Sequence, residues 1–221
     1  MSVDQGTDQG TDQGTGRGTD QGADRVAAAD ARAGEAAVGW TPKARAVLAA
    51  ASELFYAQGI HAVGVEAIAE RAGVTKKTLY DRFGSKERLV VEYLRERDRQ
   101  WRGVLDPLLA AAGPDPRARL AAVFAASADW AADRGRRGCG MINAHAEISD
   151  PDHPAYAVIV GQKRWMLDLF TGIARDAGAP DGLARDLLLL HEGALVMAGM
   201  GVVPDAFERA RDAALGLLPA H

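Results

Sequence analysis

The sequence predicts an all-helical protein. Apolar residues recur at helical spacing from residue 41 to residue 217, and no stretch keeps the strict alternation of a half-buried strand. Glycine and proline breaks divide this region into segments of ordinary helical length. A chain of 221 residues with 48% hydrophobic residues is large enough to bury the cores of one or two modest domains.

The first forty residues have a different composition from the rest. They hold 3 Arg against 7 Asp and Glu, and residues 4–22 repeat the tetrad DQGT with no apolar residue. Such a segment buries too little surface to offset the entropy lost on ordering, so residues 1–40 are predicted to be a disordered acidic tail. An acidic arm that competes with DNA for a basic surface is the functional alternative, but the composition favours a simple solvated tail.

A helix-turn-helix pattern follows from residue 41. Thr41 and the proline after it are suited to start a helix, and Gly59 to end it. A second short helix is predicted at 65–72, and Gly73 is placed to stop it. Helix, glycine turn and helix together form the helix-turn-helix arrangement, here at about residues 65–84.

The stretch GVTKKTLYDRFGSKERL, residues 73–89, supplies the third helix of this pattern. Thr75 is a natural N-cap, and Leu79 and Phe83 lie four apart on the face expected to be buried. Ser85 then caps a fourth, longer helix. The basic and hydroxyl residues of the stretch are left for the exposed faces.

The charge distribution agrees with a nucleic-acid surface at this place. Residues 41–102 carry 12 Lys and Arg against 8 Asp and Glu, whereas residues 103–221 carry 11 against 15. A basic helix pair considered alone is more often a solvated surface. Lys86, however, begins a helix, where its charge opposes the helix dipole by up to about 1 kcal/mol unless a phosphate docks there. The pattern therefore predicts a phosphate-binding surface around a helix that enters the major groove.

The segment from Thr41 to about Trp101, including ELFYAQG and VEAIAERAGVTKKTLYDRFGSKERL, resembles the N-terminal domain of the TetR family of bacterial transcriptional regulators. The resemblance implies an all-α homodimer. It also implies an N-terminal three-helix helix-turn-helix DNA-binding domain at 41–101 and a larger helical ligand-binding and dimerisation domain at 102–221.

The resemblance also assigns DNA contacts by position. One residue departs from the family pattern: Gly64 stands where many relatives have a Ser or Thr that caps the second helix, and glycine offers no hydroxyl to a phosphate. The residues that match family contacts are Thr41, Thr75, Lys76, Lys77, Thr78, Tyr80 and Lys86.

Helices are predicted throughout the remaining chain. The fourth helix should continue to about residue 111, with Pro107 as a site for a kink. Within this region RGCGMINAHAEI, residues 137–148, resembles a phrase found in one branch of TetR-type regulators. The further helices are expected at 116–134, 140–149, 154–177, 181–200 and 204–217.

Polar and aromatic residues on apolar helix stripes are candidates for a ligand pocket, because a buried polar group needs a partner that a ligand can supply. Each of them alone is more often a satisfied core or interface residue. As a set they predict a mostly apolar pocket with a few polar anchors for a small-molecule effector. The candidates are Arg97, Trp101, His145, Gln162, Trp165 and His191.

The segment 183–200 is apolar nearly all round, so another surface must cover it. With the last helix it is expected to form a four-helix interface about a twofold axis. The function implied by the family is a repressor that a small-molecule effector releases from double-stranded, (pseudo)palindromic operator DNA. An activator is one alternative, and a helical ligand-binding protein with a decayed DNA site is another.

Other classes of protein are disfavoured. His145 and Glu147 lie about 200° apart around a helix and form neither a metal site nor an acid–base pair, so no enzyme, metal or cofactor is predicted. Cys139 is the single cysteine, and inert packing is favoured over a redox-sensing role. No apolar run spans a bilayer and no secretion signal is recognisable, which predicts a cytoplasmic protein without a membrane partner.

Overall fold

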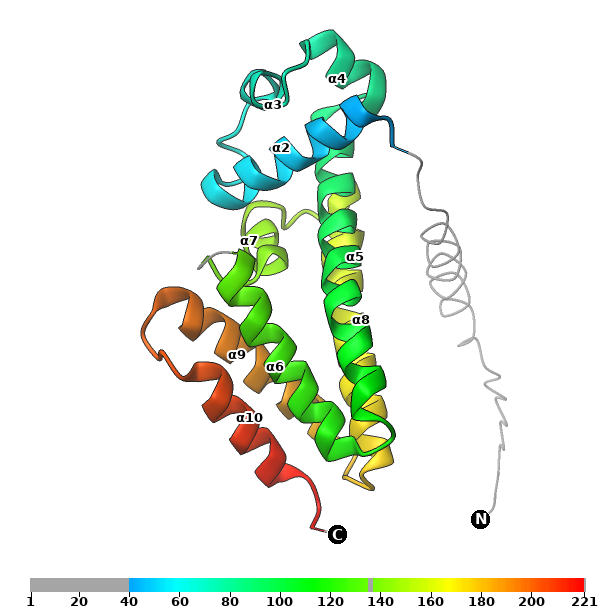
Figure 1. Cartoon of the computed structure of the whole chain (residues 1–221), viewed down its shortest axis with the longest axis vertical. Helices are drawn as coiled ribbons and strands as arrows, with labels where there is room; N and C mark the ends of the chain where they lie inside the picture. The colour runs from blue at the N-terminus through cyan, green and yellow to red at the C-terminus, as the bar shows by residue number, and fades with distance from the viewer. Residues whose placement is uncertain (1–39, 135–136, 221) are drawn as a thin grey trace, which may run out of the picture. The chain divides into compact units, whose positions relative to one another are not determined.

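A computed structural model describes residues 40–134 and 137–220, so the predicted disorder of residues 1–40 falls almost wholly outside the described part of the chain. Thr41–His221 forms one compact unit. All regular structure in the described residues is helical, as predicted (Figure 1). The helices are α2 (Pro42–Gln58), α3 (Val65–Arg71), α4 (Lys76–Phe83), α5 (Lys86–Ala112), α6 (Pro116–Arg134), α7 (Gly140–Glu147), α8 (Pro154–Asp176), α9 (Leu183–Met200) and α10 (Ala206–Leu217).

The first helices begin where the sequence places their caps. The Thr41 hydroxyl accepts a hydrogen bond from the Ala44 amide at 3.3 Å and so caps α2. The Thr75 hydroxyl accepts from the Thr78 amide at 3.1 Å and caps α4. Gly59, with φ +95°, ends α2 in a conformation that residues with a side chain rarely adopt.

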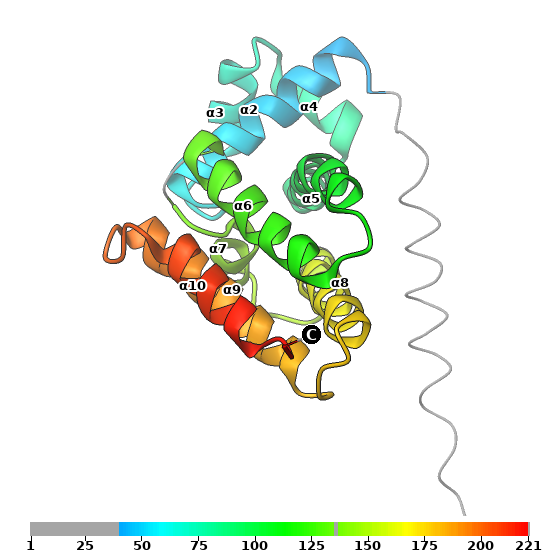
Figure 2. The ribbon, with the colours of Figure 1, turned by 60° about the horizontal axis from the view of Figure 1, so that its bottom comes forward.

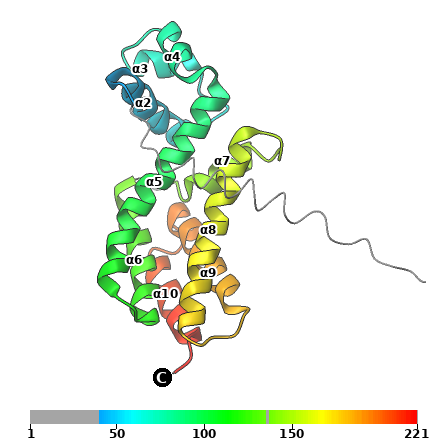
Figure 3. The same ribbon diagram turned by 90° about the vertical axis from the view of Figure 1, so that its right-hand side faces the viewer.

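Helix α5 connects the helix-turn-helix region to the other helices (Figure 3). Ser85 caps it by accepting from the Arg88 amide at 3.2 Å, as its position predicted. The helix runs for 27 residues, continues through Pro107 and ends at Gly113. It packs against α2 and α4 near its start and against α6 and α8 further along.

The C-terminal helices form a bundle around a second core. Helices α9 and α10 pack against each other, α10 also packs on α6, and α9 on α8 (Figure 2). Boundaries differ from the predicted ones by up to two residues, because helix ends depend on local capping: α7 ends at Glu147, α9 begins at Leu183 and α10 begins at Ala206. Fully buried side chains of this core include Leu105, Leu120, Phe124, Phe170, Ile173 and Leu187.

The structure predicts that adjacent residues of α4 differ in their effect on stability. Leu79 is completely buried, whereas Tyr80 is 41% exposed. We expect Leu79→Ala to lower the free energy of unfolding by about 2–5 kcal/mol, because it removes buried methyl groups and leaves a cavity. Tyr80→Ala is the matched control and should change stability by no more than about 0.5 kcal/mol. Denaturant unfolding measures both, and equal losses would contradict the packing of α4.

Candidate nucleic-acid interface and ligand pocket

The first turn of α4 presents two exposed lysines. The Lys76 ammonium donates to a carboxylate oxygen of Glu66 at 2.5 Å, and the Lys77 ammonium to Asp81 at 2.7 Å. The hydrogen bond to Glu66, with the charge of that carboxylate, raises the pKa of Lys76, which therefore stays charged at neutral pH. Exposed ion pairs of this kind contribute about 0–1 kcal/mol, so a phosphate can replace either carboxylate at little cost.

The hydroxyl groups of the candidate set already have structural roles. Those of Thr41 and Thr75 accept backbone amides as helix caps, and the hydroxyl oxygens of Thr75 and Thr78 lie 3.0 Å apart. A hydroxyl that accepts from an amide still has its own hydrogen to donate. Tyr80 is exposed on α4 and its phenol has the same capacity. Thr41 can therefore cap its helix and donate to a phosphate oxygen at the same time, whereas one hydroxyl of the Thr75–Thr78 pair gives its hydrogen to the other.

Lys86 has a different setting from the lysines of α4. It is the first residue of α5, is half-buried, and its ammonium lies 6.0 Å from the centre of the Phe55 ring. Among residues 40–134 and 137–220 no carboxylate lies within 4 Å of it, so its charge is not paired as those of Lys76 and Lys77 are. An unpaired ammonium beside the free amides of a helix N-terminus is suited to hold a phosphate.

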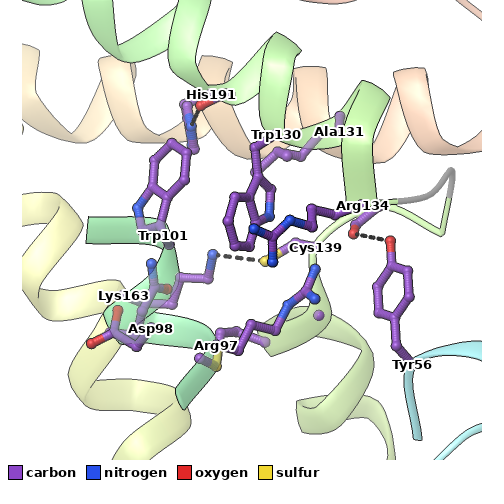
Figure 4. A pocket seen from close by; sticks show the side chains of 16 residues that line it. Tyr56, Arg97, Asp98, Trp101, Trp130, Ala131, Arg134, Cys139, Lys163 and His191 are labelled. Atoms are coloured by element: carbon purple, nitrogen blue, oxygen red, sulfur yellow. Dashed lines mark hydrogen bonds between the residues drawn. The ribbon is translucent and has the colours of Figure 1, made fainter. Parts of the chain in front are cut away.

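A pocket that is partly open to solvent lies among α5, α6, α8, α9 and the segment that leads into α7 (Figure 4). Four of the predicted ligand residues line it: Arg97, Trp101, Gln162 and His191.

Two predicted pocket residues lie elsewhere. His145 is exposed on α7, and its ring lies 5.9 Å from that of Tyr156. Trp165 is half-buried on α8, where the Arg102 guanidinium stacks 4.0 Å from the ring centre. Helical spacing places residues on the stripe of one helix, but which side of that stripe meets the cavity depends on how neighbouring helices pack.

Three buried polar atoms at the pocket have no hydrogen-bond partner in the described part of the chain. They are one carboxylate oxygen of Asp98, the indole nitrogen of Trp101 and the amide oxygen of Gln162. The side chains of Trp101 and Gln162 are each only 8% exposed. Buried polar groups are nearly always satisfied in folded proteins, so these atoms point to a water or a ligand in the pocket.

A polar chain runs along another wall of the pocket. The Lys163 ammonium donates to both carboxylate oxygens of Glu192 at 2.8 Å and lies 3.2 Å from the Cys139 sulfur. Glu192 also lies 3.3 Å from His191 Nδ1, and His191 Nε2 lies 2.8 Å from the Ser127 hydroxyl. This chain accounts for the buried His191 without a ligand.

The ion pair in this chain stays charged at neutral pH. Burial acts to raise the pKa of Glu192, but the hydrogen bond with His191 and the charge of Lys163 hold that pKa below its usual range. Burial acts in the opposite direction on Lys163, yet the Cys139 sulfur and the Glu192 carboxylate raise its pKa. The charge of Lys163 is therefore balanced within the protein.

The sequence analysis missed the residues that surround Arg97. Its guanidinium carbon lies 4.4 Å from the ring centre of Tyr56 and 5.5 Å from that of Trp130. Arg134 stacks on Trp130 at 4.4 Å and donates to the side-chain oxygen of Gln100 at 2.7 Å. Arg97 and Trp101 lie four residues apart, and Trp130 and Arg134 repeat that spacing, which could have marked the last two as pocket residues.

Helix α7 and the segment that leads into it contact the helix-turn-helix region directly. The Tyr56 hydroxyl, from the last turn of α2, donates to the Gly138 carbonyl at 3.0 Å and accepts from the Arg137 amide at 3.1 Å. The Glu147 carboxylate accepts the amides of Ile60 and His61 at 2.8 and 2.7 Å. A shift of α7 would therefore be transmitted to the turn that joins α2 to α3.

The described residues contain no group of three or more His, Cys, Asp and Glu side chains suited to hold a metal ion. None of the described helices has both the length and the apolar character needed to cross a bilayer.

Comparison with known proteins gives the same fold and a family. The family model described as "Bacterial regulatory proteins, tetR family" matches residues 47–93. A TetR-family transcriptional regulator from Streptomyces coelicolor superposes with a TM-score of 0.75 and 31% identity, over 80% of this chain and 96% of that one. Reduced NemR from E. coli superposes with a TM-score of 0.69 over 81% of this chain and 98% of its own, and at 21% identity it shows the fold alone.

A curated relative is the HTH-type transcriptional activator FasR of Mycolicibacterium smegmatis, 35% identical over 140 residues. The match covers 63% of this chain and 62% of FasR, less than two thirds of its length. With the helix-turn-helix geometry and the Streptomyces coelicolor match over nearly its full length, these comparisons show that the chain belongs to the TetR family of bacterial transcriptional regulators.

Proposed function

We propose that the protein is a homodimeric repressor that binds a (pseudo)palindromic DNA operator and releases it when a small-molecule effector enters the pocket. The observation that carries the DNA-binding part is the exposed N-terminal turn of α4, flanked by an unpaired lysine at the start of α5. A short exposed helix with basic residues at its N-terminal end suits entry into the major groove. An exposed helix N-terminus with a nearby cation suits the phosphate backbone.

The proposed contacts divide into two kinds. Lys76, Lys77 and Thr78 lie at the start of α4 and are proposed to face the groove, with Thr75 beside them. Lys86 is proposed to hold a phosphate, as are Tyr80 and Thr41. Phosphate contacts position a protein on DNA, whereas base contacts select the sequence, so the two groups should respond differently to substitution.

We expect Lys86→Ala to weaken binding to specific and scrambled duplexes alike. Each lost phosphate contact should lower the slope of log affinity against log salt by about 0.9, because one fewer counterion is released. Lys77→Ala should instead cost about 1–3 kcal/mol on the preferred duplex and relax base selection, if Lys77 contacts a base edge. Titration of DNA from upstream of the protein's own gene, at several salt concentrations, measures both effects.

The charge-matched control is Arg164→Ala, which removes an exposed cation from α8. It should leave both the affinity and the salt slope close to those of the unchanged protein. If Lys86→Ala left the salt slope unaltered, that result would contradict a phosphate contact by Lys86.

Dimerisation is proposed to use the outer faces of α9 and α10. Leu189 is 70% exposed and Met200 67% exposed on α9, and Leu217 is 49% exposed on α10. Residues 189, 193, 196 and 200 recur at helical spacing and include no charged residue, so they form an apolar stripe on α9. Covering such a stripe with a second copy would bring two recognition helices to one operator.

We expect Leu189→Glu to yield monomers and to lower operator affinity by at least about tenfold, because two half-sites would no longer be held together. Leu108→Glu, on the partly exposed part of α5, is the control and should stay dimeric. Sedimentation velocity and DNA titration test the pair. A dimeric Leu189→Glu variant would place the interface elsewhere.

Effector release is proposed to pass through the contacts between α7 and the α2–α3 turn. Glu147→Gln keeps the side-chain size but removes the charge and one of the two acceptor oxygens. We expect hydrogen exchange at the Ile60 and His61 amides to accelerate about tenfold, since a hydrogen bond to a charged group contributes about 1.5–3 kcal/mol. Glu96→Gln is the control, since the Glu96 carboxylate accepts from Arg99 on α5, and it should leave exchange at these amides unchanged. Unchanged exchange in Glu147→Gln would remove this route.

Activation of transcription is a second candidate, because FasR is an activator and is 35% identical over the matched residues. A reporter gene behind the bound promoter distinguishes the two. Deletion of the regulator should raise expression if the protein represses and lower it if the protein activates.

A further inference from the structure

We propose that the effector is a small, mostly apolar molecule that carries one anionic group, and that this group pairs with the guanidinium of Arg97. The inference rests on the proposed effector pocket and names the chemical class of its ligand. The evidence is which of the charged side chains that line the pocket are paired with an opposite charge and which are not.

Only part of the positive charge in the pocket wall is balanced by the protein. Lys163 is paired with Glu192 at 2.8 Å. Arg97 and Arg134, in contrast, have no carboxylate within 4 Å among residues 40–134 and 137–220, and Arg134 donates to a neutral amide oxygen. The basic groups of all three side chains are turned toward the same space (Figure 4). A ligand there meets two uncompensated guanidinium groups beside indole rings.

Arg97 is held in place although no hydrogen bond of its guanidinium to a described residue is found. The aromatic faces of Tyr56 and Trp130 flank it at 4.4 and 5.5 Å. Gly140 leaves room for the Arg97 side chain, because a Cβ atom at Gly140 would overlap the Arg97 Nε atom. Stacking fixes the plane of a guanidinium and leaves its N–H donors free, which is the arrangement that binds carboxylate or sulfonate oxygens in a bidentate way.

The unpartnered atoms at the pocket indicate the rest of the ligand. The Asp98 and Gln162 oxygens need a hydrogen-bond donor, and the Trp101 indole needs an acceptor. The indole rings of Trp101 and Trp130, whose centres lie 5.8 Å apart, suit a flat apolar body. An amphipathic aromatic or acyl acid with a donor group would satisfy these requirements together.

The position of Arg97 beside Tyr56 also connects the proposed anion with DNA binding. Tyr56 belongs to α2, so an anion that draws Arg97 away from the Tyr56 ring would act directly on the helix-turn-helix region. A neutral molecule of the same shape would fill the pocket without this pull on Arg97.

Two fluorescent dyes of matched shape test the proposal. 1-Anilinonaphthalene-8-sulfonate and N-phenyl-1-naphthylamine share the rings and the N–H donor, and only the first carries a sulfonate. The unchanged protein should bind the sulfonate dye at least about tenfold more tightly than the neutral one. Arg97→Gln should lower that ratio severalfold by weakening only the sulfonate dye, although Arg134 remains. Arg99→Gln, two residues along α5 and paired with Glu96, is the charge-matched control and should keep the ratio.

Gly140→Ala provides a second variant that leaves the net charge unchanged. The added methyl group should push Arg97 away from its place beside Gly140 and lower the ratio of the two dye affinities, as Arg97→Gln does. A circular dichroism melting curve reports whether the Gly140→Ala variant is folded. Equal affinity of the unchanged protein for both dyes, or an affinity ratio that Arg97→Gln does not change, would contradict an anionic effector paired with Arg97. It would not contradict the pocket itself. If neither dye binds, both the anionic class and the effector pocket are wrong. A sulfonate preference without any effect of the dye on DNA binding would leave the anion site in place and contradict effector release.

Discussion

The continuity of α5 is the physical constraint on which the other features depend. Its first residue is Lys86 at the candidate phosphate contact, and Arg97, Asp98 and Trp101 lie further along the same helix at the pocket. Lys86 and Arg97 are eleven residues apart, which corresponds to about 16 Å along a straight α-helix. A hydrogen-bonded helix packed on α2, α6 and α8 keeps that spacing, so the two candidate sites are held at a fixed distance along one rigid element.

Two further contacts join the sites beside this helix. The Tyr56 hydroxyl bonds the segment before α7, and Glu147 at the end of α7 accepts two amides of the turn after α2. The first contact reaches the segment that lines the pocket, and the second reaches the end of α7, whose first residues line it. Coupling between distant sites requires an element with two arrangements that both sites bias. The short helix α7, held by hydrogen bonds at both ends rather than by a large buried face, is suited to be that element.

The pocket combines a balanced and an unbalanced set of charges. The chain from Lys163 through Glu192 and His191 to Ser127 satisfies its own polar groups, which stabilises the wall formed by α6, α8 and α9. On the opposite side Arg97 is positioned by aromatic stacking and keeps its donors free. Because a buried charge is costly unless it is paired, an uncompensated cation in a half-buried site is better explained by ligand recognition than by stability.

The sequence by itself determined the all-helical class, the helix-turn-helix and its caps, because capping by Thr41, Thr75 and Ser85 is a local interaction within a few residues. It also marked Arg97 and Gln162 as candidate pocket residues through their places on apolar stripes. Only the tertiary structure decided which residues meet across helices: Tyr56, Trp130 and Arg134 joined the pocket, while His145 and Trp165 lay elsewhere. Periodicity gives the face of one helix, but the rotation of that helix against its neighbours is set by packing of the whole core.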